Sequence, residues 1–406
     1  MILVGDCRAR LRELDTDSVD SIVTDPPYEL GFMGKAWDAS GIAYDLDVWR
    51  ECLRVLKPGG HLLAFSGSRT YHRMVVAIED AGFEIRDQIM WLYGSGFPKS
   101  HDVSKAIDRE AGAVREVIGP TTRGAQTETT GRYGAWGEGI TPTAPATPEA
   151  ARWQGWGTAL KPAHEPICVA RKPLRGTVAQ NVLAYGTGAI NVDGCRVPSD
   201  DGFEKAWDKL VSCSSANVVL GGLAGSGRKL VDLSQNKPTG GRWPANVMHD
   251  GSDEATAGLG DAARFFYSAK ASKADRDEGL GHLPKSRGAS LNGSASGALN
   301  SGGKEPLPRV NVHPTVKPTD LMRYLVRLVT PPGGLVLDPF TGSGSTGKAA
   351  VLEGMRFVGC ELSPEYSAIA EARIKAAAVK TGQVFEIPAS PAPGRKAEAQ
   401  QLRLFA

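Results

Sequence analysis

The sequence lacks the features that mark a disulfide scaffold, a zinc protein or a membrane protein. Its six cysteines form no Cys-x-x-Cys pair and have no histidine at zinc-ligand spacing. No apolar run approaches the roughly 18 residues that a membrane-crossing helix needs. The first residues turn polar too early for a secretory signal. We therefore expect a soluble cytoplasmic protein without a metal.

An excess of charge of either sign is also missing. The 406 residues include 47 Lys and Arg against 45 Asp and Glu, so the formal net charge is +2. A nearly neutral chain exerts no broad attraction on nucleic acid or membranes. Any contact with DNA must then come from a local basic surface.

Glycine and proline, by contrast, are abundant and unevenly placed. The 49 Gly and 26 Pro residues concentrate between about residues 94 and 310, where apolar periodicity fails. On both sides of this stretch, short apolar runs alternate with amphipathic ones, which is typical of a parallel α/β sheet. We expect one interrupted core, with halves at 1–93 and 311–380, an insertion at 94–310 whose residues 160–175 return to the sheet, and a tail at 381–406 that begins with linker composition.

A glycine-rich turn follows the expected strand at 335–337. It reads Asp338-Pro339-Phe340-Thr341-Gly342-Ser343-Gly344 and precedes an expected helix, a context in which glycine lets a ligand approach the backbone. Glu361 ends the next strand, near the offset of about 20 residues at which an acid accepts ribose hydroxyls. Alone, the turn could be purely structural. The whole series predicts an adenosine-cofactor site, and the missing Gly-Lys-Ser/Thr ending disfavours ATP.

A second motif, Asp25-Pro26-Pro27-Tyr28, follows the expected strand at 21–23. Proline has no N–H, so the backbone carbonyls of this turn stay free. The Asp25 carboxylate and the Pro26 carbonyl can together accept both hydrogens of an amino group, and the Tyr28 ring can stack on a planar base. A plain turn with a surface tyrosine is the alternative reading.

Together these motifs resemble those of the S-adenosylmethionine-dependent DNA methyltransferases that methylate amino groups. Their order is similar to the β group, a circularly permuted form of the fold. Supporting motifs are Gly5-Asp6-Cys7, Leu56-Lys57-Pro58-Gly59-Gly60 and His313-Pro314-Thr315-x-Lys317-Pro318. The resemblance covers residues 1–93, 160–175 and 311–378. It implies an α/β fold: a circularly permuted Rossmann-like methyltransferase sheet with a long irregular target-recognition insertion.

The resemblance also implies a site. Asp25, Pro26, Pro27 and Tyr28 would be catalytic. The methionine part of the cofactor would lie among Asp338, Phe340, Gly342, Ser343 and Gly344. Thr315 and Lys317 would lie near its carboxylate, Glu361 at the ribose, and Asp6 and Cys7 near the adenine.

The implied reaction is transfer of the methyl group to an exocyclic amine of a base that has flipped out of double-stranded DNA. An aspartate at the first motif position is commoner among adenine-N6 enzymes, and cytosine N4 is the alternative target. An RNA or protein methyltransferase of the same fold and an inactive DNA-binding module are further alternatives. A stand-alone modification enzyme is favoured over one fused to a restriction nuclease, and a restriction-modification role and a homodimer are further open alternatives.

Two further regions carry candidate binding residues. In the insertion, Arg and Trp can contact guanine edges, phosphates and the gap left by a flipped base, although ordinary packing and surface roles compete. The candidates are Arg152, Trp153, Arg196, Arg242 and Trp243. At the C-terminus, Gln401, Leu402, Leu404 and Phe405 form a peptide that resembles the one by which bacterial replication and repair proteins bind the DNA sliding clamp. A tail folded back on its own domain is the alternative.

Overall fold

A mixed sheet organises the chain in the computed structural model, which describes residues 1–31, 36–94, 96, 100–120, 141–198, 241–269, 273–282 and 311–382. Its strand order is β1-β9-β8-β2-β3-β5-β4-β6-β7. Among the described strands, only β5 runs antiparallel to its neighbours. The strands are β1 (Ile2–Val4), β2 (Val19–Thr24), β3 (Leu56–Phe65), β4 (Glu84–Leu92), β5 (His164–Arg171), β6 (Val247–His249), β7 (Tyr267–Ser268), β8 (Leu335–Asp338) and β9 (Arg356–Glu361).

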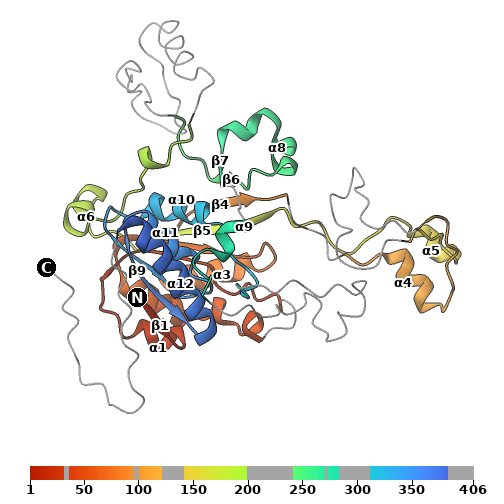
Figure 1. Cartoon of the computed structure of the whole chain (residues 1–406), viewed down its shortest axis with the longest axis horizontal. Coiled ribbons are helices and arrows are strands. Elements are labelled where there is room, and N and C mark those ends of the chain that lie inside the picture. The colour runs from red at the N-terminus through yellow and green to blue at the C-terminus, as the bar shows by residue number, and fades with distance from the viewer. Residues whose placement is uncertain are drawn as a thin grey trace, which may run out of the picture.

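Helices cover both faces of this sheet, and neighbouring strand residues point to opposite faces. On β2, Val23 belongs to a core with α10, α11 and α12, whereas Ile22 belongs to a core with α1, α2 and α3. These helices are α1 (Cys7–Leu11), α2 (Leu46–Val55), α3 (Tyr71–Asp80), α10 (Thr319–Val329), α11 (Ser345–Leu352) and α12 (Pro364–Thr381). The first and last parts of the chain therefore build one body (Figure 1).

Local sequence sets the ends of the longest helix, α12. The Ser363 side chain accepts a hydrogen bond from the backbone N–H of Tyr366, and Pro364 occupies the first helical position. The helix ends at Thr381, and the following Gly382 has a φ of 70°, a left-handed conformation that glycine adopts at little cost. None of the described helices is both long and apolar enough to cross a membrane.

The strand order reverses between β8 and β2. These strands are parallel neighbours, with Ser21 opposite Val336 and Ile22 opposite Leu337. From β8 the chain continues outward to β9 on one side, and from β2 it continues to β3 on the other. In open α/β sheets, ligands bind at such a switch point, beyond the carboxyl ends of the strands. Both sequence motifs begin at this point.

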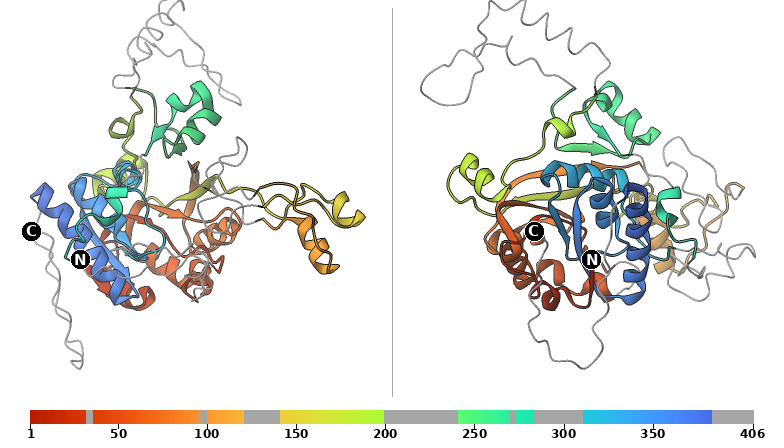
Figure 2. Two further views of the ribbon diagram at one scale, coloured as in Figure 1. Left: turned by 45° about the vertical axis from the view of Figure 1, so that its right-hand side comes forward. Right: turned by 60° about the vertical axis from the view of Figure 1, so that its left-hand side comes forward.

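The segment between β4 and α10 forms two projections in its described part (Figures 1 and 2). An arm carries α4 (Val103–Glu110) and α5 (Pro148–Arg152), and it leaves the sheet where Tyr93 N–H bonds to the Ala163 carbonyl at 3.0 Å. The other projection, which we call the β6–β7 module, carries β6, β7 and α8 (Asp253–Leu259) and extends the sheet beyond β4. The remaining elements are α6 (Val178–Tyr185), α9 (Lys273–Asp277) and the 3-10 turns η2 (Ala36–Ala39), η3 (Ile42–Tyr44), η4 (Asp193–Cys195) and η5 (Gly260–Phe265).

Candidate functional site

The two motifs meet through one short hydrogen bond. Thr24, the last residue of β2, donates its hydroxyl to Asp338 Oδ1 at 2.6 Å, although the two residues are 314 positions apart. The same oxygen accepts the Phe340 N–H at 3.0 Å. Asp338 is almost fully buried, and this burial raises the pKa of its carboxyl to about 6 despite the hydrogen bonds that favour the charged form. The Asp25 motif and the glycine-rich turn therefore start from adjoining, fixed positions.

The two carboxylate oxygens of Asp25 differ in their hydrogen bonding. Its Oδ2 accepts a hydrogen bond from Lys317 Nζ at 2.8 Å. Its Oδ1 is buried and has no hydrogen-bond partner among the described residues. A buried acceptor without a partner is costly unless a ligand supplies the missing donor. The open oxygen therefore fits an N–H or O–H group of a bound molecule.

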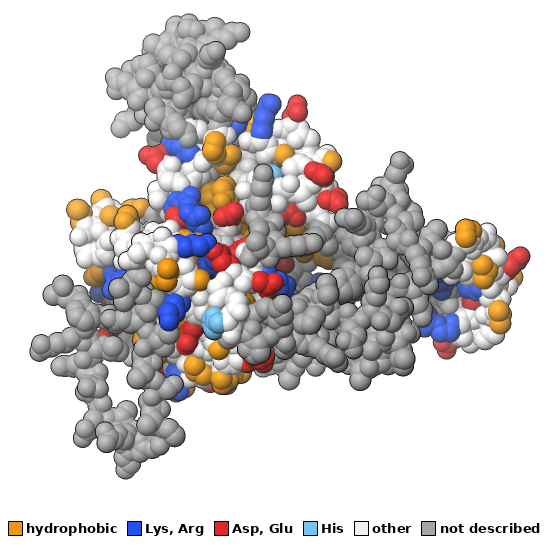
Figure 3. All heavy atoms as spheres, viewed as in Figure 1, with side chains coloured by type: hydrophobic (Ala, Val, Ile, Leu, Met, Phe, Trp, Pro, Cys, Tyr) orange, Lys and Arg blue, Asp and Glu red, His pale blue; other side chains and the backbone are white. Residues whose placement is uncertain are grey.

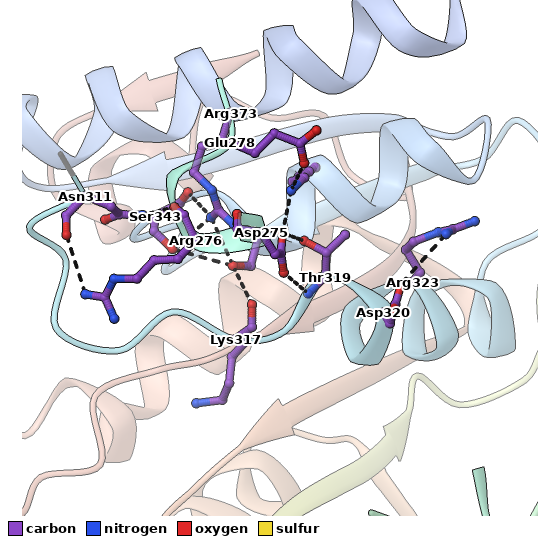
Figure 4. Close-up of polar contacts among 12 residues, drawn as sticks. Asp275, Arg276, Glu278, Asn311, Lys317, Thr319, Asp320, Arg323, Ser343 and Arg373 are labelled. Atoms are coloured by element: carbon purple, nitrogen blue, oxygen red, sulfur yellow. Dashed lines mark hydrogen bonds and ion pairs between the residues drawn. The ribbon is translucent and has the colours of Figure 1, made fainter. Parts of the chain in front are cut away.

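Lys317 connects the Asp25 motif with the glycine-rich turn. Its Nζ also donates to Tyr28 Oη at 3.0 Å, and its backbone carbonyl accepts the Ser345 hydroxyl at 3.0 Å. Burial lowers the pKa of Lys317, but the carboxylates of Asp25 and Glu165 outweigh it and raise the pKa above its usual value. In Figure 4 its side chain points away from the polar cluster around Asp275.

The predicted contact of Lys317 with the cofactor carboxylate stays a prediction, as does that of Thr315. Thr315 is exposed, and its carbonyl lies 3.0 Å from His313 Nδ1. In the structure the Lys317 ammonium instead contacts the Asp25 motif, 2.8 Å from Asp25 Oδ2.

Sequence reasoning missed Glu165, at the start of β5. Its Oε2 accepts the Tyr28 hydroxyl at 2.8 Å and lies 3.2 Å from Lys317 Nζ. The available signal was an acidic residue at the beginning of an apolar strand expected to rejoin the sheet. Because β5 is antiparallel, its first residues lie at the edge where the parallel strands end.

The glycine-rich turn is held tightly from several sides. Gly342 and Gly344 have φ values of 52° and 77°, and a Cβ on Gly344 would lie 2.8 Å from Ala370 Cα. The Gly342 N–H donates to Glu361 Oε2 at 2.8 Å. The fully buried Arg373 donates to the Ser343 carbonyl at 2.7 Å. The turn is therefore a fixed part of the fold.

Glu361 and the Asp6-Cys7 pair lie at the carboxyl ends of adjacent strands. The Gly5 N–H donates to the Glu361 carbonyl at 2.8 Å. Burial raises the pKa of Glu361, and its two oxygens accept the N–H groups of Gly342 and Ser363. Asp6 caps α1, and its hydrogen bond with the Arg8 side chain lowers its pKa. Cys7 is buried, which raises its pKa to about 12.

A short helix, α9, attaches the segment before α10 to the three C-terminal helices (Figure 4). Asp275 accepts the N–H of Thr319 at 2.7 Å and a hydrogen bond from Lys348 Nζ at 2.5 Å. The Arg373 guanidinium lies 3.7 Å from the same carboxylate. Asp275 is thus linked through Arg373 to the glycine-rich turn.

The structure brings three of the five DNA-contact candidates together. Arg196 lies over the Trp243 ring at 5.5 Å, and Arg242 lies over Phe265 at 4.8 Å. Arg264, which the sequence did not single out, lies 5.2 Å from the same Phe265 ring. We call Arg196, Arg242, Trp243, Arg264 and Phe265 the arginine–aromatic cluster of the β6–β7 module.

Arg152 and Trp153 lie elsewhere, at the end of α5 on the arm. The Trp153 ring packs edge-on against Trp156 at 5.0 Å, and both side chains are largely exposed. On the face in Figure 3, basic and acidic side chains are interspersed. The C-terminal candidates Gln401, Leu402, Leu404 and Phe405 lie outside the described residues.

Comparison with known protein families shows which family this chain belongs to. A model of the DNA methylase family matches residues 19–372, which include both motifs and the segment between them. The chain therefore belongs to the DNA methylase family.

Two curated relatives match shorter stretches. The DNA adenine methyltransferase YhdJ of Escherichia coli (strain K12) is 44% identical over 54 residues, which are 13% of this chain and 18% of the relative. The type II methyltransferase M2.DpnII of Streptococcus pneumoniae is 44% identical over 64 residues, which are 16% of this chain and 24% of the relative. The chain thus spans less than a third of the length of these relatives in the matched regions.

Solved structures with similar folds match over longer stretches at low identity. TTHA0409 of Thermus thermophilus, described as a DNA modification methylase in complex with S-adenosyl-L-methionine, is 18% identical over 93% of both chains, with a TM-score of 0.41. The cytosine-N4-specific PvuII DNA methyltransferase is 14% identical over 92% of this chain and 85% of that chain, with a TM-score of 0.43.

Proposed function

We propose that this protein transfers a methyl group from S-adenosylmethionine to an exocyclic amine of a flipped base in double-stranded DNA, with adenine N6 as the target. One observation carries the proposal: Asp25 Oδ1 is a buried acceptor without a hydrogen-bond partner among the described residues, and the preceding Thr24 bonds to Asp338 at the start of the glycine-rich turn. Membership of the DNA methylase family supports the DNA substrate. Cytosine N4 is the second candidate, since either base presents an amine to the same acceptor.

The residues around the turn fit this cofactor. S-adenosylmethionine would supply a methyl group on a positively charged sulfonium. The carboxyl groups of Asp338 and Glu361 lie at the ends of adjacent strands, where they can attract its cationic groups and accept its hydroxyls. Each Glu361 oxygen accepts one backbone N–H and keeps a further lone pair for a ribose hydroxyl.

The protein's part in the reaction is positioning. Asp25 Oδ1 and the Pro26 carbonyl would accept the two amine hydrogens, which directs the nitrogen lone pair toward the methyl carbon. Tyr28 would stack on the base and return part of the few kcal/mol that unstacking costs. As the N–C bond forms and the S–C bond breaks, the amine loses one proton, and Asp25 would help to remove it.

Asp25→Ala tests this assignment. We expect methyl transfer to DNA, measured with tritiated cofactor, to fall by about 100-fold or more, because the amine loses its acceptor. Asp47→Ala is the matched control, since Asp47 is an exposed residue of α2 that pairs only with Arg50 in the described contacts. If Asp25→Ala transfers methyl groups as fast as the parent, the site is assigned wrongly.

Analysis of the methylated product identifies the target. DNA digested to nucleosides after the reaction should contain N6-methyladenine, whereas N4-methylcytosine would select the second candidate. Label incorporated into RNA or protein but not into DNA would contradict the DNA substrate. Sequencing of DNA from cells that express the protein would locate the modified bases and give the recognition sequence.

We also propose the DNA sliding clamp as a partner of the C-terminal peptide. Its support is the sequence Gln401-Leu402-Arg403-Leu404-Phe405 after a Pro- and Ala-rich linker, which would let the tail reach a partner while the catalytic body stays on DNA. A peptide of residues 396–406 should bind the purified clamp, and a version with Leu404 and Phe405 replaced by Ala should not. No binding at high micromolar concentration would overturn the proposal.

A further inference from the structure

We propose that Glu165 is a positioning residue for methyl transfer, which keeps Asp25 Oδ1 open by holding Tyr28 and Lys317. This inference rests on the proposed function and adds a residue from the middle of the chain to the site. Glu165 reaches Tyr28 across 137 positions of sequence, and its side chain is four-fifths buried.

Three hydrogen bonds and one ion pair join Glu165, Tyr28, Lys317 and Asp25. Tyr28 Oη accepts from Lys317 at 3.0 Å and donates to Glu165 Oε2 at 2.8 Å. Lys317 has three N–H donors and faces three acceptors: Asp25 Oδ2, Tyr28 Oη and Glu165 Oε2. Every donor in this set therefore has an acceptor, and none is left over for Asp25 Oδ1.

Loss of the Glu165 carboxylate would leave two buried donors without their acceptor: the Tyr28 hydroxyl and one Lys317 N–H. Burial makes an unpaired donor costly, and Asp25, which Lys317 already contacts through Oδ2, has an Oδ1 without a hydrogen-bond partner among the described residues. Either donor would then compete with the substrate amine for that oxygen. Glu165 thus protects the acceptor on which the reaction depends.

Glu165 also sets the net charge of this group of side chains. Asp25 and Glu165 share one ammonium group, that of Lys317, so the cluster keeps one net negative charge. Positive charge develops on the amine nitrogen as it gains the methyl group. A fixed negative charge on side chains that are four-fifths buried stabilises that state more than the same charge in water would.

Glu165→Ala and Glu165→Gln test the role at saturating DNA and cofactor. We expect kcat to fall by about 100-fold for Ala and less for Gln, which keeps an acceptor oxygen. The dissociation constant of S-adenosylhomocysteine, measured by calorimetry, should stay within threefold of the parent. Glu84→Gln is the matched control, because Glu84 makes a comparable ion pair of 2.5 Å with Arg171, at the other end of β5.

Tyr28→Phe provides a second variant that keeps the stacking ring and removes only the hydroxyl. It should slow the reaction in the parent and have little further effect in Glu165→Ala, because both changes break the same hydrogen bond. Parental kcat in Glu165→Ala, or additive effects of the two substitutions, would overturn the inference. A parent that methylates no DNA would instead refute the proposed function.

Discussion

At the scale of single residues, titration of Asp338 should control how cofactor affinity depends on pH. Burial raises its pKa from 3.8 to about 6, so the protein without a ligand holds it partly protonated in mild acid. A cationic ligand favours the carboxylate, and its affinity should therefore increase as the pH rises from about 5 to 7 and then level off, by up to about tenfold per unit. Calorimetry with S-adenosylmethionine at these pH values measures this change.

Asp338→Asn should remove most of this dependence, leaving the part due to Glu361, whose pKa is also raised. Folding stability should respond to pH in the opposite direction to cofactor affinity. Because the folded state holds the Asp338 proton more tightly than the unfolded chain does, this residue lowers stability as the pH rises from 3.8 to about 6. An unchanged pH profile in Asp338→Asn would show that other groups control binding.

The sequence predicted which residues form the candidate site better than it predicted the contacts between them. The Asp25 motif and the glycine-rich turn could be found because proline and glycine mark them locally. The contact of Lys317 with Asp25 and the role of Glu165 depend on which strands become neighbours. No local pattern around Glu165 reveals that its strand is antiparallel and places it beside Tyr28.

At the scale of elements, buried ion pairs hold helix α9 against the C-terminal helices. Lys348 is 3% exposed and pairs with Asp275 at 2.5 Å. Asp275→Asn would leave this ammonium with only Glu278 among its described ion pairs, and we expect it to lower the free energy of unfolding by about 3 kcal/mol. Denaturant unfolding measures the loss.

The same substitution should weaken cofactor binding, because Arg373 joins Asp275 to the glycine-rich turn. Asp320→Asn serves as the control, since Asp320 is exposed at the start of α10 and lies 3.8 Å from Arg323. Equal stability losses in the two variants would contradict a specific role for Asp275.

The sequence predicted the elements of the core more completely than those of the long middle segment. Strand β3 begins at Leu56 and runs through Gly59 and Gly60, a pair that in sequence is typical of a turn. Gly60 fits there because a Cβ would lie 2.9 Å from the Asp20 carbonyl on β2. Strand β6 is too short for a clear alternation of apolar residues, and its pairing with β4 defines it. Strand β7, which lies in a strand-like stretch of the sequence at 264–269, pairs with β6.

For the whole molecule, a net charge of +2 makes DNA binding depend on local surfaces. The arginine–aromatic cluster combines guanidinium groups with exposed rings, as Trp243 is 65% exposed. If it contacts phosphates, Arg242→Ala should weaken binding to all sequences and reduce the slope of log affinity against log salt by about one. Fluorescence anisotropy at several salt concentrations measures this, with exposed Arg50→Ala as the control. If the slope of log affinity against log salt is the same in Arg242→Ala as in the parent, Arg242 does not contact DNA phosphates.

The interrupted core also has a consequence for biosynthesis. Strand β2 is made early, yet β8, which covers one of its edges, follows after about 300 residues. At translation rates of roughly 5–20 residues per second, that edge stays open for about 15 to 60 s on the ribosome. An uncovered strand edge invites pairing with other chains. The pairing of β2 with β8, which brings Thr24 to Asp338 in the finished protein, therefore leaves one edge of β2 exposed throughout synthesis of the middle segment.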